Sequence, residues 1–174
     1  MTVPYGPLFQ MSFIVDDLEA AVAHWTTLGV GPFYLIERPQ FVQYDYLGEE
    51  IDLEMSAAIG HSGELQIELI VQHNPEVPTI FTERRGPPGA VNHLCAYTDD
   101  LDESLAFVQA RGGRRLQGGN SHDGSRICYV EIPGPTPIII EFAQLTPPTR
   151  AVFEDVRLAA IDWDGSDPLR RFIY

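Results

Sequence analysis

The sequence predicts an α+β fold made of two modules with the same plan. Residues 10–29 and 93–112 are related by a constant offset of 83 residues, and the shared positions include a pair of aspartates and a closing glycine. Each copy begins with roughly five or six residues of alternating polarity, which indicates a half-buried strand. An Asp-Asp-Leu-acid segment follows, which suits the N-cap and the first turn of a helix. Each copy then continues as an amphipathic helix that ends at a glycine.

The segments around these copies extend each of them into a βαβββ module. Residues 8–72 form the first module and residues 91–145 the second, and the Pro- and Gly-rich residues 73–90 link them. The elements we expect are strand 8–15, helix 17–28, a strand at 33–36, strands near 41–47 and 51–58, strand 63–72, strand 92–98, helix 100–111, and strands near 114–118, 126–132 and 137–143. Residues 1–146 then make one domain, and residues 147–174 add a C-terminal helix and a tail.

Composition and charge exclude several classes of protein. The chain has 174 residues, a net charge of −14 and no lysine. The acidic balance argues against nucleic-acid binding, and the lack of lysine excludes Schiff-base chemistry and a Gly-Lys-Ser/Thr phosphate loop. No run approaches the ~18 apolar residues of a membrane-spanning helix, and the first residues lack the features of a signal peptide. We therefore expect a cytoplasmic protein.

Four polar residues stand at equivalent places in the two modules. Gln10 opens the first strand of one module, and His93 opens the first strand of the other. Glu68 and Glu141 each lie in the middle of an otherwise apolar last strand. A buried carboxylate is costly unless it is paired or bound to a cation. One imidazole, two carboxylates and an amide oxygen suit a divalent metal ion. The alternative is that each side chain is solvated at the surface without a metal.

Other conspicuous residues have plainer explanations. The paired aspartates are explained as helix caps. His24, His61 and His73 are expected to be surface or structural histidines. Cys95 and Cys128 are too few for a disulfide scaffold, so we expect reduced thiols in the core.

Four segments resemble the ligand-bearing segments of the vicinal oxygen chelate superfamily, which includes glyoxalase I, methylmalonyl-CoA epimerase, extradiol dioxygenases and metal-free drug-binding proteins. The segments are FQMSFIVDDLEAAVAHW, GELQIELI, VNHLCAYTDDLD and PIIIEF. The resemblance covers about residues 8–145. It implies a cupped mixed sheet, formed by the two modules around one cleft, with a metal held by Gln10, Glu68, His93 and Glu141.

The resemblance also implies a metal-dependent isomerase, epimerase or lyase that acts on a small-molecule carbonyl compound. Zn, Ni, Co, Mn or Mg would suit the mixed oxygen and nitrogen ligands. In such an enzyme the carbonyl is polarised, the adjacent C–H becomes acidic, and a metal-stabilised enolate forms while a carboxylate moves the proton. Glu54, on the polar face of the strand at 51–58, resembles the catalytic carboxylate of the epimerase branch, and Glu141 is the reserve candidate.

Two other functions stay open at the level of the sequence. An extradiol dioxygenase commonly uses two histidines and one carboxylate on iron, and His93 is the one histidine among the four positions. A metal-free binding or resistance protein would have the same fold. We also expect a homodimer, because exposed sheet edges invite pairing and because members of the resembled family commonly dimerise.

Overall fold

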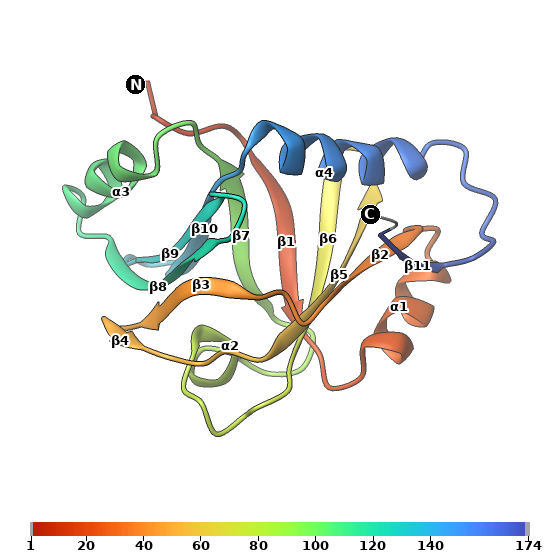
Figure 1. Cartoon of the computed structure of the whole chain (residues 1–174), viewed down its shortest axis with the longest axis horizontal. Helices are drawn as coiled ribbons and strands as arrows, with labels where there is room; N and C mark the ends of the chain where they lie inside the picture. The colour runs from red at the N-terminus through yellow and green to blue at the C-terminus, as the bar shows by residue number, and fades with distance from the viewer. Residues whose placement is uncertain (1, 173–174) are drawn as a thin grey trace.

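This computed structural model describes residues 2–172 of the chain. They fold into one mixed sheet of eleven strands with four helices around it (Figure 1). The strands are β1 (Leu8–Ile14), β2 (Phe33–Glu37), β3 (Phe41–Tyr46), β4 (Glu49–Glu50), β5 (Met55–Ser62), β6 (Leu65–Gln72), β7 (Val91–Tyr97), β8 (Arg114–Ser121), β9 (Arg126–Ile132), β10 (Ile138–Gln144) and β11 (Leu169–Arg171). The helices are α1 (Leu18–Thr26), α2 (Ile80–Glu83), α3 (Leu101–Gln109) and α4 (Pro147–Ala159). None of these helices is long and apolar enough to cross a membrane. The predicted α+β class is confirmed.

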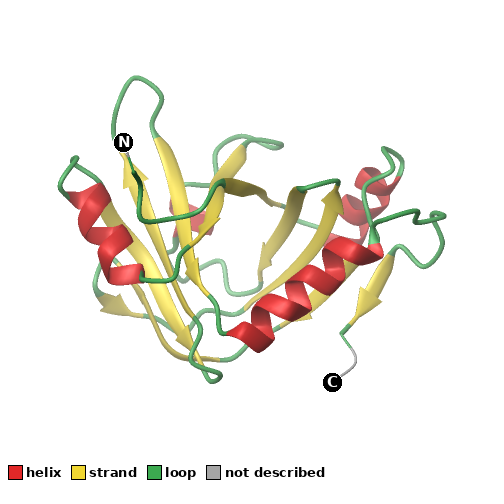
Figure 2. Ribbon diagram, turned by 90° about the horizontal axis from the view of Figure 1, so that it is seen from above, coloured by secondary structure: helices red, strands yellow, loops and turns green. Residues whose placement is uncertain are grey.

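Each module forms one half of the sheet, and the two halves have the same internal order. From the centre outward, the first half runs β1, β6, β5 and β2, and the second runs β7, β10, β9 and β8. In each half the first strand of the module pairs in parallel with its last strand. β1 and β7 join the halves through antiparallel pairing, with Ser12 opposite His93. The sheet curves strongly, as Figure 2 shows from above.

The repeated aspartates start the two equivalent helices. Asp17 caps α1 by accepting a hydrogen bond of 2.9 Å from the backbone N–H of Ala20. Asp100 caps α3 in the same way, with a bond of 2.9 Å from Glu103. Each cap satisfies an N–H group that the first turn of a helix leaves without a partner. The chain therefore leaves the strand and begins a helix at this point. The cap prediction is confirmed for the second aspartate of each pair, whereas the first aspartates, Asp16 and Asp99, form ion pairs with Arg85 and Arg150.

The two faces of the central strands have different neighbours, because successive side chains of a strand point to opposite sides. Met11 and Phe13 of β1 pack with the apolar residues of α1 on the outer face. Gln10 and Ser12 point to the inner face, which is the concave side of the sheet. An apolar cluster covers one end of this inner face, near β3 and α2, and it includes Ile14, Tyr44, Met55, Ala57, Ile70, Phe81, Tyr129 and Ile139. α4 crosses the other end (Figure 1).

β3 does not stay in the first half of the sheet, contrary to the prediction that residues 41–47 belong to the first module. It crosses to the second half and pairs with β8, with Tyr44 opposite Gly119. A side chain at position 119 would overlap the Tyr44 ring, so the glycine leaves the space that the ring occupies. Arg115 of β8 holds the neighbouring Asp45 through two hydrogen bonds of 2.5 Å.

The strand that we expected at 51–58 runs from Met55 to Ser62 instead. The side chain of Asn74 binds the segment that precedes β5. It accepts a hydrogen bond from the N–H of Glu54 and donates one to the carbonyl of Asp52. These side-chain bonds hold residues 52–54 outside the strand, and the backbone N–H of His73 still donates to the carbonyl of Glu54 at 2.7 Å. The strand then continues further than predicted, up to the tight turn into β6.

The C-terminal region begins its helix two residues before the predicted Thr149, with prolines in the first turn, where a missing N–H costs nothing. α4 ends at Ala159, so Trp163 does not extend its apolar stripe as predicted. Its ring packs instead against Gly31, where a side chain would collide with it. β11 then adds a parallel strand to the edge of β2.

Candidate metal centre

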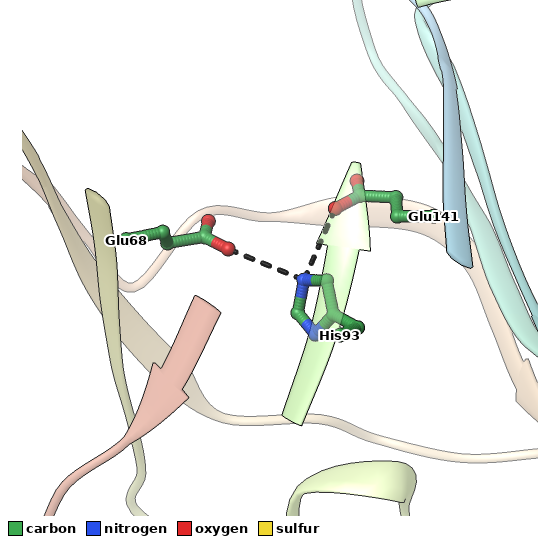
Figure 3. A group of neighbouring side chains, drawn as sticks. All are labelled: Glu68, His93 and Glu141. Atoms are coloured by element: carbon green, nitrogen blue, oxygen red, sulfur yellow. Dashed lines mark ion pairs between the residues drawn. The ribbon is translucent and has the colours of Figure 1, made fainter. Parts of the chain in front are cut away.

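Three charged or polar side chains converge on the inner face at the middle of the sheet. Glu68 comes from β6, His93 from β7 and Glu141 from β10, and Figure 3 shows them pointing toward one another. One ligand atom from each lies within 4.8 Å of the others. His93 Nε2 lies 3.3 Å from Glu68 Oε2 and 3.3 Å from Glu141 Oε2. The structure therefore brings together three of the four predicted ligands.

His93 is oriented by its neighbour in the sequence. Asn92 donates from its amide nitrogen to the carbonyls of Ile80 and Arg84, with distances of 3.1 and 3.0 Å, so its oxygen is left to face the ring. His93 Nδ1 lies 3.0 Å from this oxygen and is therefore the protonated nitrogen. When the ring is neutral, Nε2 therefore carries the lone pair, and it faces the two carboxylates. A ring nitrogen fixed in this way by a polar partner is typical of metal-binding histidines.

His93 Nε2 tests whether the residues fit a metal ion. The His93 side chain is 1% exposed, and among the described residues its Nε2 is a buried polar atom without a hydrogen-bond partner. Buried polar atoms without partners are rare, because each costs free energy. A cation between Nε2 and the carboxylate oxygens of Glu68 and Glu141 would satisfy all three groups. The donor set, one nitrogen and carboxylate oxygens, suits a divalent metal.

Without a metal ion, the protonation of His93 and that of the two glutamates affect each other. Burial disfavours a charged imidazole, but the carboxylates of Glu141 and Glu68 outweigh burial and raise the pKa of His93 to about 9. Burial also raises the pKa of Glu141, which the neighbouring His93 partly offsets. The pocket therefore favours a positive charge between the two glutamates.

Gln10, the fourth predicted ligand, lies beside this cluster on β1 and is 4% exposed. Its amide nitrogen donates a 2.6 Å hydrogen bond to Gln66. Its oxygen lies 3.4 Å from the Ser12 hydroxyl, and the same hydroxyl donates to Glu68 Oε2 at 2.5 Å. The carbonyl oxygen of Gln10 is therefore turned toward Glu68 and away from Gln66. Its role as a ligand stays a prediction.

Ser12 and Cys95 are two residues of the site that the sequence patterns did not single out as functional. Ser12 is in register with Glu68, and Cys95 is in register with Glu141. Burial and the nearby carboxylates raise the pKa of the Cys95 thiol, so it stays protonated. The offset of 83 residues relates Ser12 to Cys95 and could have pointed to both.

Aromatic rings close the centre on the side of the apolar cluster. The Tyr129 ring stands edge-on to the His93 ring, with centroids 4.9 Å apart, and Phe81 lies 6.3 Å from it. Tyr129 is also opposite Glu141 in the sheet. These rings exclude water from one side of the carboxylates, which strengthens electrostatic interactions there.

Glu54, the first candidate for proton transfer, lies away from this cluster. Ile59 is the β5 residue opposite Glu68. At ~3.3 Å per residue, Glu54 lies roughly 16 Å along the chain from that level. Its carboxylate is about half exposed and forms an ion pair with Arg38. The expected position of Glu54 beside the metal site is therefore corrected, because β5 begins one residue after it and runs toward the centre.

A cavity of about 670 Å³ lies between α4 and the inner face of the sheet. His61 and Gln66 contribute to it from β5 and β6, and Glu68 follows Gln66 by two residues on the same face of β6. Two residues of a strand span roughly 7 Å, so the cavity and the cluster are neighbours. The remaining wall is mixed, with apolar and charged side chains that include Phe9, Tyr97, Leu145, Phe153, Arg150 and Arg157.

α4 is attached to both halves of the sheet across this cavity. Arg150 lies 3.5 Å from Asp99 in the second half, and its guanidinium stacks over the Tyr97 ring at 4.5 Å. Arg157 binds Glu64 in the first half at 3.0 Å. The helix therefore spans the opening between the halves and forms one wall of the cavity.

Comparisons with known proteins agree with this architecture. The sequence profile of the Glyoxalase/Bleomycin resistance protein/Dioxygenase superfamily matches residues 9–129. Methylmalonyl-CoA epimerase from Mycobacterium tuberculosis is similar in structure, with a TM-score of 0.54 and 19% identity over 87% of this chain and 95% of that chain. A hypothetical protein from Bacillus halodurans C-125 has a TM-score of 0.55 and 17% identity over 80% of this chain and 94% of that chain.

At these identities the two solved structures support the fold and carry no argument about the reaction. No curated protein sequence matches the chain. The superfamily profile spans well over half of the chain and includes the first module, the linker and the second module as far as β9. The family resemblance of the sequence is thereby confirmed. The chain belongs to the glyoxalase/bleomycin resistance protein/dioxygenase superfamily.

Proposed function

We propose that this protein is a metal-dependent isomerase, epimerase or lyase that moves a proton next to the carbonyl group of a small molecule. The observation that carries the proposal is the position of the buried His93 Nε2, which makes no hydrogen bond and lies 3.3 Å from a carboxylate oxygen of both Glu68 and Glu141. One histidine and two glutamates differ from the two-histidine, one-carboxylate set of iron dioxygenases. A protein that only enclosed an apolar ligand would have no use for two carboxylates at this depth.

The residues that would hold the metal are Gln10, Glu68, His93 and Glu141. When bound, a divalent cation supplies Lewis acidity, which polarises a carbonyl and makes the adjacent C–H more acidic. Zn, Ni, Co, Mn and Mg all remain compatible with the donor set. The protein contributes a fixed arrangement of donors and a site from which the rings of Phe81 and Tyr129 exclude water.

Glu141 is the residue best suited to take the proton. It is 7% exposed, and in the metal-free protein burial raises its pKa above that of an ordinary glutamate. Glu68 is held differently, because the Ser12 hydroxyl donates a 2.5 Å hydrogen bond to it. The thiol of Cys95, beside Glu141, is a weaker donor than a hydroxyl. Glu68 therefore serves as the anchored ligand and Glu141 as the group that exchanges a proton.

The cavity next to α4 supports a small substrate. Its volume of about 670 Å³ is in the usual range for ligand sites. The stacked rings of Phe9 and Tyr97 offer an apolar surface, and Gln66 offers a polar one on the side of Glu68. A substrate carbonyl that enters from this side reaches the centre past Gln66. A metal-polarised carbonyl compound of modest size fits this arrangement.

Metal analysis tests the centre itself. Protein purified without chelator is expected to contain one divalent ion per chain, and His93→Ala is expected to lose it, because His93 is the one nitrogen ligand. Circular dichroism of both proteins serves as the control for folding. Equal metal content in a folded His93→Ala protein would contradict the proposal.

Solvent deuterium exchange tests the reaction. A panel of acyl thioesters, hemithioacetals and cyclic carbonyl compounds is incubated with the metal-loaded protein in D₂O, and incorporation next to the carbonyl is followed by mass spectrometry. Glu141→Gln is expected to slow exchange by at least about 100-fold, the usual contribution of a positioned acid or base. Glu54→Gln is the matched control, because its carboxylate lies at the surface with Arg38. Loss of exchange in Glu54→Gln alone would return the role to Glu54.

A further inference from the structure

A row of buried polar side chains connects the cavity to the metal centre. His61 Nε2 lies 2.9 Å from the amide nitrogen of Gln66, and the Gln66 oxygen accepts a 2.6 Å hydrogen bond from the amide nitrogen of Gln10. The Gln10 oxygen lies 3.4 Å from Ser12, which donates to Glu68. His61 and Gln10 are each 4% exposed, and Gln66 is 1% exposed. None of these groups has free access to bulk water that could replace a lost partner.

With the two amides oriented as they are in the structure, the donors and acceptors of this row fit one order. An amide NH₂ group donates and does not accept, so His61 Nε2 must accept from Gln66. The oxygen of Gln66 then faces Gln10 and accepts from its NH₂ group. Gln10 is left with its oxygen on the side of Ser12 and Glu68. If His61 Nε2 carried a proton instead, both amides would have to turn over, and Gln10 would present NH₂ to the centre, which cannot bind a cation.

We propose that His61 and Gln66 are positioning residues that fix the orientation of the Gln10 amide, with its carbonyl oxygen toward Glu68. This inference rests on the proposed metal site for its consequence, which is that Gln10 is oriented as a ligand before the cation arrives. Neither His61 nor Gln66 belongs to the set that would touch the metal. They determine which end of the Gln10 amide faces Glu68, the oxygen or the NH₂ group. The two ends have almost the same shape, so packing alone does not distinguish them.

The acceptor role of His61 requires a neutral ring with its proton on Nδ1, a buried atom that makes no hydrogen bond within the described part of the chain. Burial lowers the pKa of His61, which favours the neutral ring, and the groups that face it do not reverse this effect. Those groups are the Gly63 backbone in the β5–β6 turn, Glu64 in the same turn, and Arg157 and Glu154 from α4.

A double-mutant cycle separates orientation from packing. Chelator-treated protein is titrated with Co²⁺ alone, and the dissociation constant is followed by calorimetry and by the visible absorption of the bound ion. Gln66→Leu is made in the parent protein and in a Gln10→Glu background. A carboxylate has two equivalent oxygens, so with Glu at position 10 there is no orientation left for Gln66 to select.

We expect Gln66→Leu to weaken Co²⁺ binding about 10- to 100-fold in the parent, the usual effect of losing a group that orients a ligand. In the Gln10→Glu background the loss of Co²⁺ affinity caused by Gln66→Leu is expected to fall below about 3-fold, because the carboxylate has no wrong orientation. The effects of the two substitutions are then not additive. His61→Leu is expected to behave like Gln66→Leu. Equal losses in both backgrounds would show a role in packing only, and no loss in the parent would also overturn the proposal.

A second measurement tests the order of the bonds without a metal. The ¹⁵N chemical shifts of the His61 ring in chelator-treated protein, assigned by comparison with His61→Gln, report which nitrogen carries the proton. Protonation of Nδ1 alone supports the inference. A proton on Nε2 would overturn it, whatever the Co²⁺ titration shows. A parent protein that binds no Co²⁺ would instead contradict the proposed function, and the ring spectrum would still decide the orientation of Gln10.

Discussion

Ser12 and Cys95 occupy equivalent positions in the two halves of the sheet, and each stands in register with the glutamate of its own half. The hydroxyl of Ser12 donates a short hydrogen bond to Glu68. The thiol beside Glu141 is a poorer donor. An otherwise symmetric centre therefore has one carboxylate that accepts a short hydrogen bond from a hydroxyl and one whose pKa is raised by burial. In the function proposed above, this difference of one atom type, oxygen against sulfur, distinguishes the anchored ligand Glu68 from the proton-exchanging Glu141.

Exchanging the thiol for a hydroxyl should remove this difference. Cys95→Ser gives Glu141 a stronger donor, which lowers its pKa and weakens it as a base. We expect deuterium exchange in the substrate panel to slow about 10-fold, within the range set by the basicity of a positioned carboxylate, while metal content stays at one ion per chain. Cys95→Ala is the control, because it removes the donor and should leave the exchange rate close to that of the parent. A Cys95→Ser protein as fast as the parent would contradict the assigned roles.

The chelator-treated protein should lose stability as the pH rises from neutral to alkaline values. The carboxylates raise the pKa of His93 from 6.5 to about 9 in the folded chain. A raised pKa means that the folded state holds the proton more tightly, so the stabilisation is complete below pH 6.5 and is lost as the pH rises through 9. A rise of this size corresponds to on the order of 3 kcal/mol.

Urea denaturation of chelator-treated protein between pH 6 and 9.5 measures this loss. His93→Gln provides the comparison, since glutamine does not titrate, and the difference between the two proteins isolates the contribution of His93. The free energy of unfolding of the parent should fall toward that of the variant across this range. Parallel profiles for the two proteins would exclude a proton held between the glutamates.

The crossing of β3 can be tested at Gly119. A methyl group at this position would overlap the Tyr44 ring and lie 3.0 Å from the backbone oxygen of Gln43. We expect Gly119→Ala to destabilise the protein by about 1–3 kcal/mol, the usual cost of overpacking a filled site. Urea denaturation measures the change. In a Tyr44→Ala background the cost should be smaller, because the ring is gone; an unchanged cost would mean that the ring and the glycine are not in contact.

The expected homodimer stays a prediction, and the sheet edges offer little support for it. β4 at one edge has two residues, both glutamates, and β11 at the other has three residues, two of them arginines. Short and charged edges discourage further pairing. A dimer would therefore have to use another surface. Light scattering at micromolar concentration is expected to give twice the mass of one 19.4 kDa chain, and the mass of a single chain would end the prediction.

The internal repeat explains why much of the fold was predictable from the sequence. Asp17 and Asp100 mark helix starts through a local hydrogen bond, which depends on residues only three positions away. The same offset relates Gln10 to His93 and places both near the centre of the sheet. Local and repeated signals of this kind survive in a single sequence. They account for the confirmed helices and for the class of the fold.

The sequence predictions that were wrong depend on interactions between segments far apart in the chain. The place of Glu54 depends on where β5 begins, and that start is set by Asn74, which lies twenty residues later. Residues 41–47 pair with the second half because Gly119 leaves room for Tyr44. The hydrophobic pattern of the first half does not indicate this pairing. The positioning role of His61 likewise depends on its register with Gln66 across a hairpin.

The crossing of β3 also affects the protein while it is being made. Tyr44 pairs with Gly119, which follows it by 75 residues, so at the usual speed of translation the partner strand arrives roughly 4 to 15 seconds later. During that interval the first half has its own central strands but not the strand that covers β3. Phe41 and Tyr44, whose rings pack against each other at a tilt in the finished protein, then lie on an unpaired strand. Unpaired apolar strands favour aggregation, so the growing chain, still attached to the ribosome, is more exposed to it than the finished fold.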